Sequence, residues 1–77
     1  MKTIQILGTG CANCTNTFRL VEEVARAKGV DIVLSKVEDL PSIVRLGVIS
    51  TPGVVIDGQV VHAGGVPSRE QVERWLR

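Results

Sequence analysis

The two cysteines of the chain, Cys11 and Cys14, form a Cys-x-x-Cys motif with Ala12 and Asn13 between them. The motif follows a short apolar segment and the glycine-containing turn Gly8-Thr9-Gly10, and it precedes a long segment with helical spacing. Two cysteines three positions apart at the start of a helix can bring their sulfur atoms within bonding distance. The spacing therefore predicts a pair that can switch between one disulfide and two thiols.

The position of the motif predicts two unequal thiols. Cys11 is expected at the exposed N-terminal end of the helix, where free backbone N–H groups and the helix dipole favour a thiolate. Cys14 falls on the apolar stripe of the first turn, so we expect it to be more shielded and less acidic. This asymmetry predicts thiol–disulfide exchange, in which Cys11 attacks a substrate disulfide and Cys14 then attacks Cys11 and releases the reduced substrate.

Two other interpretations of the cysteines remain open. Both could be small core residues, although Cys11 stands in a glycine-rich loop. A Cys-x-x-Cys loop between a strand and a helix also suits a soft monovalent metal. A closed zinc site would need two further ligands, and the chain has a single histidine, His62, and no third cysteine. We therefore expect no structural zinc and no bound metal cofactor.

Thr51-Pro52 is the second candidate site. It directly precedes an apolar segment, and X-Pro is the sequence context in which cis peptide bonds occur. A cis bond here would place Thr51 beside the cysteine pair, where its backbone N–H and C=O could pair with an extended substrate segment. The alternative is an ordinary trans proline that begins an edge strand.

The secondary structure that must position these residues follows from spacing and turn signals. Gly29 is a suitable helix end, Asp57-Gly58 is a strong hairpin signal, and Ser68 with Gln71 predicts a capping box. We expect strands at Lys2–Leu7, Val30–Val37, Val54–Ile56 and Gln59–Ala63, and helices at Ala12–Lys28, around Leu40–Leu46 and from Ser68 to Leu76. The order β-α-β-α-β-β-α predicts an α/β fold, a mixed four-stranded sheet with helices on both faces, whose first two strands are parallel.

Length and charge narrow the possible functions. A chain of 77 residues predicts one domain, residues 1–77. Its 9 Lys and Arg against 8 Asp and Glu give a net charge of +1, which argues against a nucleic-acid partner. No apolar run approaches the roughly 18 residues of a membrane span, and Gln5 and Gly8 interrupt any signal-peptide core. We therefore expect a cytoplasmic protein without a membrane partner.

The motifs together resemble the thioredoxin superfamily, in particular its small thioredoxin or glutaredoxin-like redox-active disulfide proteins. The resemblance rests on Gly8–Cys14, on Ser50–Gly58, and on Gly64 ahead of Val66-Pro67-Ser68. It implies a minimal thioredoxin fold and an enzyme, a thiol–disulfide oxidoreductase or electron carrier of the protein disulfide reductase type. It also implies Cys11 as the nucleophile, Cys14 as the resolving cysteine and Pro52 as the cis-proline.

The resemblance extends to substrates and partners. The residues expected to bind substrate are those around the pair and the proline, namely Gly10, Ala12, Asn13, Thr51, Pro52 and Gly64. The expected substrates are disulfide-containing proteins or small thiols, an upstream reductase supplies electrons, and the Cys11–Cys14 disulfide is the only redox group. One departure concerns proton transfer: thioredoxins place a buried acid six residues ahead of the first cysteine, where this chain has Gln5.

The first half of the chain also resembles heavy-metal-associated copper chaperone domains, which carry a Cys-x-x-Cys after their first strand. That resemblance implies an alternative function, Cu(I) binding and transfer by the same two cysteines. Those domains usually have Met two residues before the first cysteine, where this chain has Thr9, and they end in a strand. A redox-inert interaction module is the third possibility, and it would need a large exposed apolar patch.

Overall fold

The computed structural model describes residues 2–8, 12–48 and 50–76. The strands are β1 (Lys2–Leu7), β2 (Ile32–Val37), β3 (Gly53–Ile56) and β4 (Gln59–Ala63), and the helices are α1 (Ala12–Lys28), α2 (Leu40–Arg45) and α3 (Arg69–Trp75). This order confirms the predicted β-α-β-α-β-β-α arrangement. None of the helices in these residues combines the length and apolar character needed to cross a membrane.

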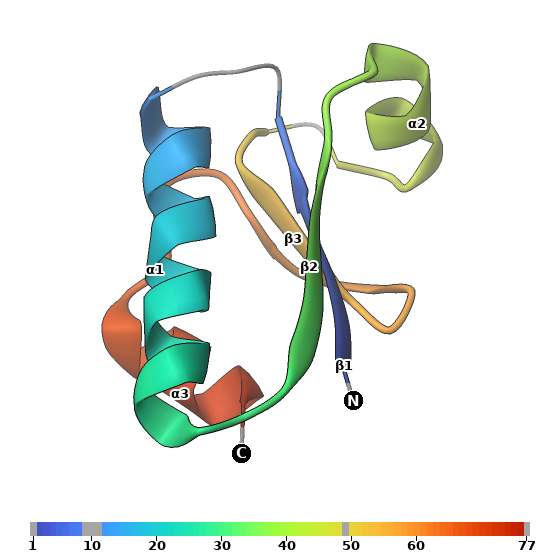
Figure 1. Ribbon diagram of the computed structural model, residues 1–77. Helices are drawn as coiled ribbons and strands as arrows, with labels where there is room; N and C mark the ends of the chain where they lie inside the picture. Colours follow the sequence, from blue (N-terminus) through green and yellow to red (C-terminus); the bar gives the residue numbers. More distant parts are fainter. Residues whose placement is uncertain (1, 9–11, 49, 77) are drawn as a thin grey trace.

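The described strands form one mixed sheet in the order β2-β1-β3-β4 (Figure 1). β1 is parallel to β2, with Ile6 opposite Lys36, and antiparallel to β3, with Ile4 opposite Ile56. β3 and β4 form the predicted antiparallel hairpin. β1, the strand that leads into the cysteine motif, is therefore paired with a neighbouring strand along each of its two edges.

Helices cover both faces of the sheet, as predicted (Figure 1). On one face, buried residues of α1 and α3 pack against β1 and β3 to form the larger cluster: Ile4, Ile6, Val21, Val24, Ala25, Val54, Ile56, Val72 and Leu76. On the other face, α2 and the segment after it contribute to the smaller cluster: Leu7, Ile43, Val48 and Val55. Both clusters are aliphatic, so the core relies on close packing of branched side chains rather than on aromatic area.

The predicted hairpin and helix cap are both confirmed. Asp57 and Gly58 have φ values of 50° and 85°, the positive angles that a tight hairpin turn requires at both positions. The Ser68 hydroxyl accepts from the Gln71 amide at 3.2 Å, and the Gln71 side chain accepts from the Ser68 amide at 3.0 Å. This reciprocal pair satisfies two amides at the start of α3.

The second strand begins two residues later than predicted, at Ile32 rather than Val30. Gly29 adopts a φ of 66°, and its amide donates to the Arg26 carbonyl while the Val30 amide donates to the Ala25 carbonyl at 3.0 Å. These bonds satisfy the last carbonyls of α1. The Val30 amide is therefore used by the helix end and not by the sheet.

Candidate functional site

Cys14 lies in the first turn of α1 and is 7% exposed. Its sulfur takes part in a disulfide. Cys11, the other cysteine of the chain, lies outside the described residues, as does Gly10. The first turn of α1 contains no acidic residue, so no carboxylate in that turn offsets the positive end of the helix dipole. The shielding predicted for Cys14 is confirmed.

The lack of a side chain at Gly8 leaves space for the Cys14 sulfur against the end of β1. A Cβ atom added at Gly8 would overlap the Cys14 sulfur and would lie 3.0 Å from the Cys14 Cβ. The Gly8 amide also donates to the Val37 carbonyl at 3.0 Å, which fixes this backbone to the end of β2. From the segment Gly8-Thr9-Gly10, Gly8 was predicted only as a turn residue. The available signal was the general rule that a glycine at a strand marks a close approach.

The loop before β3 brings Thr51 to the same place. The Thr51–Pro52 peptide bond is cis, Pro52 is buried and Thr51 is exposed. A Cβ atom at Gly8 would lie 3.7 Å from the Thr51 Cβ as well as against Cys14. Thr51 therefore lies beside the end of β1 on which Cys14 packs.

Gly64 connects the end of β4 to this loop. Its amide lies 3.1 Å from the Ser50 carbonyl and 3.0 Å from the Pro52 carbonyl, and it donates to both. Gly64 has a φ of 82°, and an added Cβ would come within 3.2 Å of the Ser50 Cβ, so a glycine is needed for both conformation and space. These hydrogen bonds thus hold Gly64 next to Thr51 and Pro52, so the three predicted residues lie close together.

Ala12 and Asn13, the two residues inside the motif, are exposed in the first turn of α1. The Asn13 carbonyl accepts a hydrogen bond from the Thr17 hydroxyl at 2.8 Å, which satisfies the one buried polar side chain found among the described residues. The side chains of both residues are therefore open to solvent next to Cys14 in the sequence.

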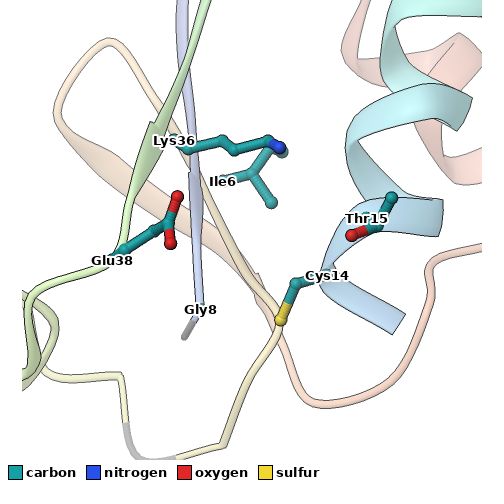
Figure 2. Close-up of a pocket in the computed structure, with 6 residues that line it drawn as sticks. All are labelled: Ile6, Gly8, Cys14, Thr15, Lys36 and Glu38. Carbon is teal, nitrogen blue, oxygen red and sulfur yellow. The ribbon is translucent and has the colours of Figure 1, made fainter. Parts of the chain in front are cut away.

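A cavity of about 30 Å³ lies on the inner side of Cys14, between α1 and the sheet. It is lined by Ile6, Gly8, Cys14, Thr15, Lys36 and Glu38 (Figure 2), and it is called the Cys14 cavity below. The Lys36 ammonium also lies 4.9 Å from the centre of the Phe18 ring, a favourable cation–π position. Motif spacing contains no signal for Lys36 and Glu38, because the β1–β2 pairing and the segment after β2 bring them to the cavity.

The position that thioredoxins fill with a buried acid does not face this cavity. Gln5 is half-buried and pairs with Ser35 and Val55. Side chains alternate along a strand, so Gln5 shares the face of Leu7, which packs in the smaller cluster. Ile6 is the β1 residue that lines the Cys14 cavity. The other ionisable groups that line this cavity are therefore Lys36 of β2 and Glu38 of the segment that follows it.

Comparisons with known proteins agree with one another. A family model described as a thioredoxin domain matches residues 2–77. The chain is 34% identical over 76 residues to a thioredoxin of Methanothermobacter thermautotrophicus, covering 99% of each chain. It is 36% identical over 77 residues to a thioredoxin of Methanocaldococcus jannaschii, covering 100% of this chain and 88% of that one.

A solved structure shares the fold. The solution structure of the oxidised thioredoxin from Plasmodium falciparum superposes with a TM-score of 0.69 at 17% identity, covering 99% of this chain and 82% of that one. At this identity the likeness concerns the fold alone.

Proposed function

Because this chain belongs to the thioredoxin family and is a thiol–disulfide oxidoreductase, we propose that it reduces disulfides through the pair Cys11 and Cys14. The observation that carries the proposal is the buried, disulfide-bonded Cys14 at the start of α1, with Thr51 beside it. The matches to thioredoxins give no support to the alternative of Cu(I) transfer.

Cys11 is the nucleophile in this proposal. Cys11 directly precedes Ala12, the first residue of α1, and the positive end of a helix dipole favours a thiolate over a thiol. The Cys11 thiolate attacks one sulfur of the substrate disulfide and forms a mixed disulfide, and the other substrate sulfur leaves as a thiolate.

Cys14 completes the reaction. Its sulfur is buried against Gly8, so it is shielded from outside disulfides and reacts with its neighbour. Cys14 loses its proton and attacks the Cys11 sulfur, the bond between Cys11 and the substrate breaks, and the substrate leaves with both of its sulfurs reduced. Two electrons have then passed from the dithiol to the substrate, and an upstream reductase must return them.

The surface formed by Thr51, Pro52 and Gly64 binds the substrate in this proposal. Proteins with disulfides are the substrates of thioredoxins, and an extended segment beside Thr51 can pair with its backbone as an added strand would. The exposed residues Ala12 and Asn13 line the other side of the approach. Small disulfides would react at the same place, and we place the reaction in the cytoplasm.

The two cysteines can be tested separately. Cys14→Ser is expected to accumulate a mixed disulfide between Cys11 and a protein disulfide substrate, visible by mass spectrometry, because the second step is blocked. Cys11→Ser is expected to lose reduction of an insulin-type disulfide by at least about a hundredfold, because its remaining thiol is buried. A Cys11→Ser variant that still reduces insulin, or a Cys14→Ser variant that traps nothing, would contradict the assigned roles.

A further inference from the structure

The Cys14 cavity adjoins the cysteine whose proton must leave before the second step. Its volume of about 30 Å³ is sufficient for a water molecule, which needs roughly 10–15 Å³ of free volume. Among its described lining residues, Lys36 and Glu38 carry the titratable groups besides Cys14, while Ile6, Gly8 and Thr15 carry none. Figure 2 shows Lys36 of β2 and Glu38, which follows β2, across this space from Cys14 and Thr15 of α1.

The parallel pairing of β1 and β2 places Lys36 at the Cys14 cavity. Lys36 stands opposite Ile6, and the Gly8 amide binds the carbonyl of Val37. Glu38, the residue directly after the end of β2, also lines the cavity. Phe18 of α1 lies under the Lys36 ammonium at 4.9 Å, which keeps this cation near the first turns of the helix.

We propose that Glu38 accepts the proton of Cys14 through a water molecule in the Cys14 cavity, and that Lys36 stabilises the thiolate that remains. This inference rests on the proposed function, in which Cys14 is the resolving cysteine. Ile6, the β1 residue that faces the cavity, is apolar, so the carboxylate comes from the segment that follows β2.

The step balances without any further reactant. The Cys14 S–H bond breaks and its proton passes by way of water to a Glu38 carboxylate oxygen. The Cys14 thiolate forms the bond to the Cys11 sulfur, and the electron pair of the broken mixed disulfide leaves with the substrate sulfur. When the upstream reductase opens the disulfide again, the protonated Glu38 returns the proton to Cys14.

The two roles of a carboxylate have opposite consequences, which makes the inference testable. As a nearby negative charge, Glu38 disfavours the Cys14 thiolate, so Glu38→Gln is expected to lower the pKa of Cys14. As a proton acceptor, Glu38 speeds the loss of the proton, so the same substitution is expected to slow the second step. A lower pKa combined with a slower reaction is expected only if Glu38 carries the proton.

The experiment follows the reaction of the reduced protein with dithiobis-nitrobenzoate, whose two coloured thiolates report the two steps in turn. With Glu38→Gln, the first release, caused by Cys11, is expected to change less than about twofold. The second release, caused by Cys14, is expected to slow about tenfold at about pH 6 and to approach the unsubstituted rate at about pH 10, which is above the ordinary pKa of a thiol. Glu38→Asp is expected to restore most of the rate.

A second measurement tests Lys36. In a Cys11→Ser background, Lys36→Met keeps the length of the side chain and removes its charge, and it is expected to raise the pKa of Cys14 by about half a unit or more. The ultraviolet absorbance of the thiolate follows this titration. Lys28→Met and Glu70→Gln are matched controls, because they make the same charge changes on another part of the surface. Neither control is expected to alter the second release or the pKa of Cys14.

A second release that stays unchanged or becomes faster in Glu38→Gln overturns the proton transfer, and an unchanged Cys14 pKa in Lys36→Met overturns the role of Lys36. If the unsubstituted protein releases neither thiolate, the proposed function fails and the inference fails with it. If it releases both and the variants behave like the controls, only the inference fails.

Discussion

The two faces of the sheet are built on different scales. Among the described residues, the face under α1 and α3 buries a cluster of nine side chains, with Phe18 and Trp75 packed at its border. The face under α2 buries a cluster of four. α1 has 17 residues, whereas α2 has six and leaves Leu40 and Val44 of its own apolar side chains 61% and 70% exposed. Among the described residues, more side chains are thus buried on the α1 and α3 face of the sheet than on the α2 face.

The site combines one part from each side. Cys14 belongs to α1 and lies over the larger cluster, while Thr51 and Pro52 follow α2 and the smaller cluster. The cysteine is therefore fixed by much more buried apolar surface than the segment that leads to Thr51. An oxidoreductase of this kind must hold its reacting sulfur in a fixed position and accept varied substrates beside it. Here the larger cluster of buried side chains lies on the side of the sheet that carries Cys14.

The largest expected effect compares two isoleucines. Ile4 and Ile43 are 1% and 2% exposed but belong to the larger and the smaller cluster. Ile4→Ala is expected to lower the free energy of unfolding by about 4 kcal/mol and Ile43→Ala by about 2 kcal/mol, because a site beside a short helix collapses more easily around a cavity. Urea unfolding of the oxidised protein measures both.

Val33→Ala is the control for this comparison, since Val33 is 47% exposed on β2, and it is expected to change stability by less than about 0.5 kcal/mol. If Ile4→Ala does not fold, Ile4→Val and Ile43→Val allow the same comparison at a smaller scale. Equal losses at the two isoleucines would contradict the difference between the faces.

The next effect concerns the contact between β1 and α1. Gly8→Ala is expected to destabilise the oxidised protein by about 2 kcal/mol, because its Cβ would overlap the Cys14 sulfur and force the helix away from the strand. Gly29→Ala separates this crowding from backbone effects: Gly29 has a φ of 66° with open space around it, so its cost of about 1 kcal/mol comes from conformation alone. Thermal unfolding of an oxidised Gly8→Ala that matches the parent would contradict the close packing.

The smallest effect lies at the start of α2. Hydrogen bonds from the Ser42 side chain and backbone hold the pKa of Asp39 below its ordinary value of 3.8. Because the folded pKa is lower than the unfolded one, the stabilisation is complete well above pH 3.8 and is lost as the pH falls through the lowered value. Melting temperatures of the parent and Asp39→Asn should differ slightly at neutral pH and converge in acid. A difference that grows in acid would reverse the sign of the interaction.

Much of the fold could be predicted because its signals are local. The Asp57-Gly58 turn and the Ser68–Gln71 cap each depend on residues within a few positions of each other. Apolar spacing gave the helix bounds at Ala12 and Lys28 for the same reason. The cysteine spacing and the helix start likewise predicted the burial of Cys14 before any tertiary contact was known.

The surroundings of Cys14 could not be predicted in the same way. Lys36 lines the cavity through a strand register, and a shift of one residue would turn it to the other face. Glu38 lines the cavity from the segment that follows β2. Counting back from the cysteine indicated Gln5, although alternation along β1 turns Ile6 toward the cavity.

The central place of β1 has a consequence for synthesis. The strand begins with Lys2, yet one of its two neighbours, β3, lies about fifty residues further along the chain. On the ribosome, the first strand can pair with β2 while its other edge waits for Gly53–Ile56 to emerge. Cys14 therefore receives its final surroundings only after β3 has been translated.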